Sequence, residues 1–229
     1  AMGYSVDRIK VVSCDFKNGY APQGGDYYAG GGGLTFINCE FLKNEKQKNT
    51  MIHVDNGMWA EFYNSFFDVA GYNNLFSSGF THRIYNSTII NLEGRLYVQP
   101  WTGHEFVFVN NILTAKAGSN YQLEPDTANL WNGWDGMVTI KNSRLPVIPA
   151  SYMYNTTGGI SVTSSDTLPV HFVDSANGDY RLSLLDDHHN IGDTTVTLYK
   201  DVNGVNRPDI NGYVDYGAYE SDASFLHLY

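Results

Sequence analysis

Apolar and polar residues alternate in short runs along the first two thirds of the chain, and one pattern of six residues recurs. Each run holds Asn, a small residue, a variable residue and an apolar residue, with Ser in place of Asn in the first copy. The runs are 11–16, 36–41, 62–67, 84–89, 108–113 and 140–145. β-Branched and aromatic residues dominate them, which predicts short strands.

The Asn position of this repeat has a nearly regular spacing. Its occupants are Ser13, Asn38, Asn64, Asn86, Asn110 and Asn142, with steps of 25, 26, 22, 24 and 32 residues. A step of about 24 residues suits one coil of a solenoid, whose strands pair with the equivalent strands about 4.8 Å away in the next coil. We therefore predict an all-β protein, a right-handed parallel β-helix of about six coils.

Two other all-β folds compete with this interpretation. A β-propeller needs about 40 residues or more per blade, so these repeats are too short for one. A β-sandwich gives no reason for a recurring Asn position. The repeat therefore favours the β-helix.

Apolar residues two and four positions before the Asn are predicted to point into the core. They are Leu34 and Phe36, Ala60 and Phe62, Phe106 and Phe108, and Val138 and Ile140. The Asn itself is expected at a bend, where its amide can bond the Asn residues of the coils above and below.

The residue after the Asn is small, and two of its occupants are the only cysteines, Cys14 and Cys39. They are predicted to stack in neighbouring coils as small buried thiols. A disulfide is disfavoured, because the parallel geometry would strain it.

The repeat divides the chain into two parts. Residues 1–150 are predicted to form the coils, and the 32-residue step indicates an insertion near 118–136. Residues 151–229 are predicted to be a β-rich closing region of the same domain, which covers the last hydrophobic coil. Because coil sequence begins almost at the first residue, we expect further coils or another domain upstream.

Charge and hydropathy restrict the partners. The formal net charge is −10 at pH 7, which disfavours nucleic acid and anionic membranes. No apolar run is long enough to span a membrane. We expect a monomer.

Two C-terminal stretches resemble a known family. Phe172-Val173-Asp174 with Gly178-Asp179-Tyr180-Arg181-Leu182 is similar to the segment that closes many bacterial pectate-lyase-like β-helix proteins. Arg207-Pro208 followed by Val214-Asp215-Tyr216-Gly217-Ala218-Tyr219-Glu220 resembles their usual ending. The run 183–189 departs from the family, which usually has a Ser-Pro-Ala-like sequence there.

The resemblance implies a secreted or surface-displayed protein of the kind found in Bacteroidetes polysaccharide-utilisation systems. It implies an architecture more than an activity, since one fold supports many functions. Polysaccharide lyases with this fold use Ca²⁺ or a basic residue against a uronate carboxylate, with Lys or Arg as the base.

Catalytic residues cannot be assigned from the pattern. The basic residues of the coils, such as Arg83, Arg95 and Arg144, fall in different positions of the repeat, and so do the acidic ones. Asp186-Asp187 lies in the closing region, where a turn role is expected. A catalytic pair is therefore not evident.

Metal ligands are also not evident. His53, His82 and His104 lie 11, 4 and 6 residues before the Asn, so they do not align. The Asp and Asn residues between 201 and 215 lack the EF-hand spacing, and turn formation explains them, although they leave Ca²⁺ as an alternative. We predict no metal and no cofactor.

Aromatic residues are the strongest candidates for ligand contact. They lie in the segments before the repeat strand, beside Gly or polar residues, so that stacked coils bring them to one face. Such a row can stack on the sugar rings of an extended chain, and the alternative is that the rings fill the core or cover loops. The candidate carbohydrate-binding residues are Tyr28, Trp59, Trp101, His104, Trp131 and Trp134.

These observations lead to one function and two alternatives. We predict a non-catalytic polysaccharide-binding module that stacks sugar rings on loop aromatics. The alternatives are a lyase or glycoside hydrolase acting on a uronate-containing glycan, and a structural or adhesin stalk.

Overall fold

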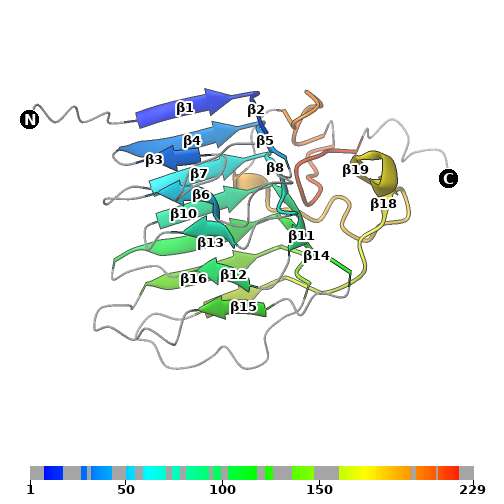
Figure 1. Cartoon of the computed structure of the whole chain (residues 1–229). Coiled ribbons are helices and arrows are strands. Elements are labelled where there is room, and N and C mark those ends of the chain that lie inside the picture. The colour runs from blue at the N-terminus through cyan, green and yellow to red at the C-terminus, as the bar shows by residue number, and fades with distance from the viewer. Residues whose placement is uncertain are drawn as a thin grey trace, which may run out of the picture.

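The computed structural model forms a right-handed parallel β-helix, which confirms the predicted fold class (Figure 1). The structure describes residues 8–17, 27–29, 32–42, 50–54, 59–70, 74–77, 81–92, 95–98, 103–117, 122–125, 136–146, 160–196, 200–209 and 211–221. The predicted insertion at 118–136 lies mostly outside these residues.

The first sheet is the longest and runs the length of the solenoid. All its strands are parallel, and each pairs with the strand of the next coil. Its order is β1 (Arg8–Val12), β4 (Gly33–Ile37), β7 (Trp59–Tyr63), β10 (Thr81–Tyr85), β13 (Glu105–Val109), β16 (Met137–Lys141) and β17 (Ile160–Thr163).

Two further faces complete the coils. The second sheet contains β2 (Asp15–Phe16), β5 (Glu40–Phe41), β8 (Phe66–Asp68), β11 (Thr88–Leu92) and β14 (Ile112–Ala115). The third face contains two sheets. One consists of β3 (Tyr27–Ala29), β6 (Thr50–Val54) and β9 (Asn74–Ser77), and the other consists of β12 (Arg95–Val98) and β15 (Gln122–Pro125).

The number of coils differs from the predicted six. The first sheet has seven strands, whereas the second has five and the third face has three and two in the described part of the chain. Strand β17 adds a rung beyond residue 150 and pairs in register with β16. The six-residue pattern does not extend to this rung, because Thr167 stands three positions after the bend residue Ser164, where the pattern has an apolar residue.

Each bend between the first and second sheets is a single left-handed residue. The backbone φ is between 45° and 59° at Ser13, Asn38, Asn64, Asn86, Asn110, Asn142 and Ser164. Asn tolerates this conformation better than most residues, which explains its recurrence.

The predicted Asn ladder forms only in part. Asn64 Nδ2 donates to Asn38 Oδ1 at 3.3 Å, and Asn110 Nδ2 donates to Asn86 Oδ1 at 2.8 Å. Asn64, Asn86 and Asn110 also donate to backbone oxygens of residues 200, 196 and 193. The ladder is therefore shared with the C-terminal segment.

The small residue after the bend forms a second, more regular ladder. The Ser87 hydroxyl donates to Tyr85 O at 2.9 Å and accepts from Ser65 N at 3.1 Å. The same pair of bonds recurs at Ser143, which accepts from Asn111 N. These bonds satisfy backbone groups that the bend removes from the sheets.

The two cysteines are free, as predicted, but only Cys39 is buried. Cys14 is exposed, which corrects the prediction of two buried thiols. Its strand neighbours, β1 and β2, are the outermost described strands of their sheets, so the Cys14 side lacks the covering coil that Cys39 has.

The core consists of residues that stack from coil to coil. All eight residues predicted to point inward are at most 3% exposed. Phe41 stacks between Phe16 and Phe67, with ring centroids 4.7 and 4.9 Å apart. Phe36 stacks on Phe62 at 5.0 Å, so the rings follow the rung spacing.

The C-terminal segment lies beside the coils, along the bends and the second sheet (Figure 1). It begins with an antiparallel hairpin, β18 (Phe172–Asp174) and β19 (Asp179–Leu182), joined by the short helix η1 (Ser175–Asn177), and a second short helix, η2 (Thr194–Val196), follows. This lateral position differs from the expected cover over the last coil. No helix in the described part of the chain is long and apolar enough to cross a membrane.

Candidate carbohydrate-binding face

The structure places two of the six predicted carbohydrate-binding residues with their side chains, Trp59 and His104. The backbone of Tyr28 lies in β3, where it is paired with His53. Trp101, Trp131 and Trp134 lie outside the described residues. The candidate site is therefore built around Trp59 and His104.

Trp59 and His104 lie on the same border of the first sheet, the one at which its strands begin. Trp59 begins β7 and is the register partner of Thr81, the first residue of β10. His104 directly precedes β13, and its Nδ1 is 3.2 Å from the Thr81 hydroxyl. Two rungs separate Trp59 and His104, or about 10 Å at 4.8 Å per rung.

The Trp59 indole lies across Gly33 of the preceding rung. A Cβ atom at Gly33 would overlap the indole, so only glycine leaves room for it. The Arg8 guanidinium carbon lies over the Trp59 ring, 5.2 Å from the ring centre, which is a cation–π distance. Trp59 as a residue is half-buried.

Next to Trp59, charged side chains alternate in sign across the rungs. Arg83 Nη1 donates to Glu61 Oε1 at 3.1 Å, and Arg83 Nε donates to Glu105 Oε1 at 2.9 Å. Arg8 Nη2 donates to the Thr35 hydroxyl and lies 3.7 Å from Glu61. Each of these two arginines is therefore paired with a carboxylate.

A tyrosine pair follows the charged residues toward the bend. The rings of Tyr63 and Tyr85 are 5.0 Å apart and tilted by 31°, and both are half-buried. The Tyr63 hydroxyl donates to Glu61 Oε2 at 3.4 Å. Burial and the nearby Glu61 charge raise the pKa of Tyr63 to about 12, so the hydroxyl stays protonated.

The tyrosine pair is not among the predicted binding residues, which all lie before the repeat runs. Tyr63 and Tyr85 directly precede the bend residues Asn64 and Asn86. They occupy the outward positions that alternate with the buried Phe62 and Ile84. Strand alternation was thus the signal that could have found them.

His82 belongs to the core and not to this face. It is 1% exposed, and its ring meets Phe106 edge to face at 4.6 Å. Burial lowers the pKa of His82 to about 3, so the imidazole is neutral. Among the described residues, no group of His, Cys, Asp and Glu could hold a metal ion.

The acidic residues of the C-terminal segment bond backbone N–H groups. Asp201 accepts from Val205 N at 2.8 Å and from Glu220 N at 2.8 Å. Asp215 accepts from Asn190 N and Ser221 N at 2.8 and 2.7 Å. The bond from Val205 N closes a turn, whereas the bonds from Glu220 N and Asn190 N join stretches that are 19 and 25 residues apart.

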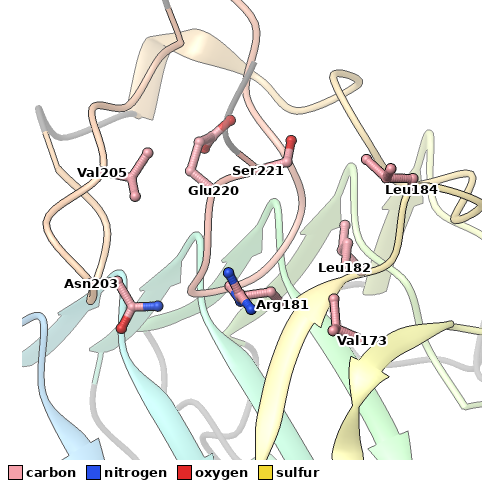
Figure 2. A pocket seen from close by; sticks show the side chains of 8 residues that line it. All are labelled: Val173, Arg181, Leu182, Leu184, Asn203, Val205, Glu220 and Ser221. Carbon is pink, nitrogen blue, oxygen red and sulfur yellow. The ribbon is translucent and has the colours of Figure 1, made fainter. Parts of the chain in front are cut away.

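A cavity of about 380 Å³ lies in the C-terminal segment, between the hairpin and the chain around residues 203–205 and 220–221 (Figure 2). Its walls include Val173, Leu182, Leu184, Val205, Arg181 and Glu220. Burial raises the pKa of Glu220 to about 7, even though Arg207 Nε donates to its Oε2 at 2.5 Å. Both Glu220 oxygens already accept bonds within the protein, from Arg207 and from Asp215 N.

Within the described residues, the cavity and the outer face of the first sheet are two features that could meet a ligand. The outer face carries the half-buried Trp59 and Tyr63 and the Thr81 hydroxyl, whereas Arg181 and Glu220 of the cavity are bonded to Asp179 and Arg207, which lie outside its lining. No protein-family model, curated protein or solved structure matches this chain.

Proposed function

We propose that this protein is a non-catalytic polysaccharide-binding module whose ligand lies on the outer face of the first sheet. One observation carries the proposal: the half-buried Trp59 indole rests on Gly33 at the sheet edge. An aromatic ring held in this way offers a preorganised surface for the apolar face of a sugar ring.

The arrangement of aromatic residues suits an extended ligand. Trp59 and Tyr63 are four residues apart on β7, or about 13 Å at 3.3 Å per residue. Tyr85 extends this contact into the next rung. A chain of several sugar units can therefore reach both aromatic positions, with Thr81 and His104 as hydrogen-bonding groups beside Trp59.

The charges of this face favour an uncharged glycan. Arg83 is bonded to two glutamates, and Lys141 Nζ donates to Asp193 Oδ2 at 2.6 Å. A uronate would have to displace these carboxylates, and the net charge of −10 adds repulsion at long range. The same pairing argues against the lyase alternative, which needs a basic residue able to accept a proton from the substrate.

The resemblance of the C-terminal ending to bacterial pectate-lyase-like β-helix proteins supports a secreted or surface location in a Bacteroidetes-type polysaccharide-utilisation system. Trp101, Trp131 and Trp134 are proposed to extend the binding surface, since their segments precede the repeat strand as that of Trp59 does, whereas Tyr28 lies in β3 on the third face. The stalk or adhesin alternative gives no role to an indole seated on glycine.

The proposal is tested by affinity electrophoresis in gels containing neutral polysaccharides, with pectin and alginate as acidic ones. We expect retardation in at least one neutral gel, and a loss of at least tenfold in affinity for Trp59→Ala. Leu185→Ala is the control, because Leu185 lies in the C-terminal segment outside the first sheet and is 87% exposed, so its substitution should leave retardation unchanged. Equal retardation of Trp59→Ala and wild type, or migration unaffected by every glycan, would contradict the proposal.

A further inference from the structure

A buried histidine ties the C-terminal segment to the last rung of the solenoid. The His188 side chain is fully buried, and its two ring nitrogens contact two different carboxylates. Nδ1 lies 2.6 Å from Asp186 Oδ1, and Nε2 lies 3.1 Å from Asp166 Oδ1. Asp166 follows β17, and its backbone forms a parallel β-bridge with that of Arg144, so it belongs to the coils.

Both contacts are hydrogen bonds only if the imidazole is protonated at both nitrogens. Ionised carboxylates are acceptors only, and a neutral imidazole has one donor. Loss of the proton would leave one nitrogen lone pair facing a carboxylate in a buried site, where such a contact is costly. With both carboxylates ionised, the geometry therefore favours an imidazolium.

We propose that His188 is a pH-sensitive clasp, which holds the C-terminal segment against the bends while it is protonated and releases it when the proton is lost. The segment held in this way includes residues 188–193. Asp193 N donates to Asn110 Oδ1 at 2.6 Å, and Asn110 Nδ2 donates back to Asp193 O at 2.8 Å. Release would open this contact with the bend.

The groups around His188 come from three elements. On its own loop, Asp186 also accepts from the backbone N–H of His188 and of His171, whose ring is exposed. From the last two rungs, Asp166 and the half-buried Arg144 contribute one charge of each sign.

From the chain end, the Tyr216 ring packs against the imidazole at 5.6 Å, and burial raises the pKa of Tyr216 to about 12, so that it stays neutral. The adjacent His189 contacts Asp215 at 3.2 Å and Ser183 O at 2.7 Å.

The direction of the pH effect follows from these neighbours. Burial lowers the pKa of His188, but hydrogen bonds and charges from Asp186 and Asp166 outweigh burial and raise it above 6.5. Protonation therefore favours the folded state. The clasp is fully closed below pH 6.5 and loosens as the pH rises through the raised pKa of the folded protein.

Two measurements on the wild-type protein test the clasp. Imidazole ¹⁵N spectra should show both His188 nitrogens protonated at pH 6.5, with a titration midpoint above that of a free histidine. Amide exchange, corrected for the intrinsic rate, should show protection of Asp193 N–H falling at least tenfold between pH 6 and pH 8.5. Protection of the core amide of Phe108 should stay constant.

Variants separate the clasp from general effects of pH. In His188→Gln we expect low protection of Asp193 N–H at pH 6 and no further decrease at pH 8.5. His104→Gln, which leaves the clasp intact, should behave as the wild type. A singly protonated His188 at pH 6, or protection of Asp193 that is independent of pH in the wild type, would overturn the proposal, and both results are obtained even if His188→Gln fails to fold.

Discussion

The coils and the C-terminal segment each bury a histidine, and the pKa values of the two histidines are shifted in opposite directions. His82 packs inside the coils against Phe106, and burial keeps it neutral, with a pKa of about 3. His188 is equally inaccessible, yet two carboxylates raise its pKa. Burial alone therefore does not decide the charge of a residue; its partners do.

This contrast extends to the two regions as a whole. The coils are stabilised by stacked apolar side chains and by backbone and hydroxyl ladders. The C-terminal segment instead buries ion pairs, among them Arg207 with Glu220, which are 1% and 2% exposed. We therefore expect defects in the coils to be insensitive to pH unless they involve His82, and defects in the C-terminal segment to depend on pH.

The largest effect is expected in the coil core. Phe41→Ala removes the middle ring of the stack formed by Phe16, Phe41 and Phe67 and leaves a cavity. The free energy of unfolding should fall by about 3–5 kcal/mol. Denaturant titrations at pH 6 and pH 8 should give the same loss. A loss that differs strongly between the two pH values would contradict the separation of the two regions.

The second-largest loss of stability is expected when a buried ion pair is broken. Arg207→Met leaves the Glu220 carboxylate buried without its partner and removes the bonds from Arg207 Nη1 to Asn64 and Gly217. We expect a loss of about 3 kcal/mol at pH 8. The loss should be smaller at pH 6, because Glu220, whose pKa burial raises to about 7, can then be protonated.

Two control variants accompany this prediction. Arg181→Met breaks an exposed pair with Asp179 and should cost less than about 1 kcal/mol. The double variant Arg207→Met with Glu220→Leu should recover much of the stability, since it removes both buried charges. If the double variant were as unstable as Arg207→Met, packing rather than charge would explain the loss.

His82 gives a pH effect of the opposite sign to that of His188. Its folded pKa of about 3 lies below the unfolded value of 6.5, so its contribution is complete above pH 6.5 and is lost as the pH falls toward 3. His82→Leu should remove this dependence. Below pH 6, plots of unfolding free energy against pH should differ in slope by up to about 1.4 kcal/mol per pH unit between wild type and variant. Parallel plots would refute a neutral His82.

The smallest loss of stability is expected when one hydroxyl of the serine ladder is removed. Ser87→Ala leaves the buried N–H of Ser65 without its acceptor and should cost about 1–2 kcal/mol. Cys14→Ser, in the same column but exposed, should change the stability by less than about 0.5 kcal/mol. Equal effects of the two substitutions on the denaturation midpoint would argue against the ladder.

The sequence predicted the coils far better than the C-terminal segment. Asn or Ser recurs from Ser13 to Asn142 because each bend needs a residue with left-handed backbone conformation. This local requirement appears in the sequence as a regular spacing. Arg207 and Glu220 are thirteen residues apart, and nothing in their spacing indicates burial. Isolated charges resemble those of a solvated loop until tertiary contacts bring them together.

The candidate site could be predicted from the sequence only in part. Trp59 and His104 were found because they precede the repeat strand, and the structure brings them to one sheet edge. The pairing of Arg83 with Glu61 and Glu105 arises across rungs and depends on register. Register follows from the repeat, but the direction of each long side chain does not.

Hydroxyl-radical footprinting with mass-spectrometric readout tests the central claim, that the outer face of the first sheet binds a neutral polysaccharide. With a neutral glycan that retards the protein, oxidation of Trp59 should fall several-fold and that of Tyr63 and Tyr85 should also fall. Leu185, which is 87% exposed in the C-terminal segment, should be oxidised equally with and without glycan. Protection of the 182–185 stretch with unchanged oxidation of Trp59 would place the ligand elsewhere and contradict the account.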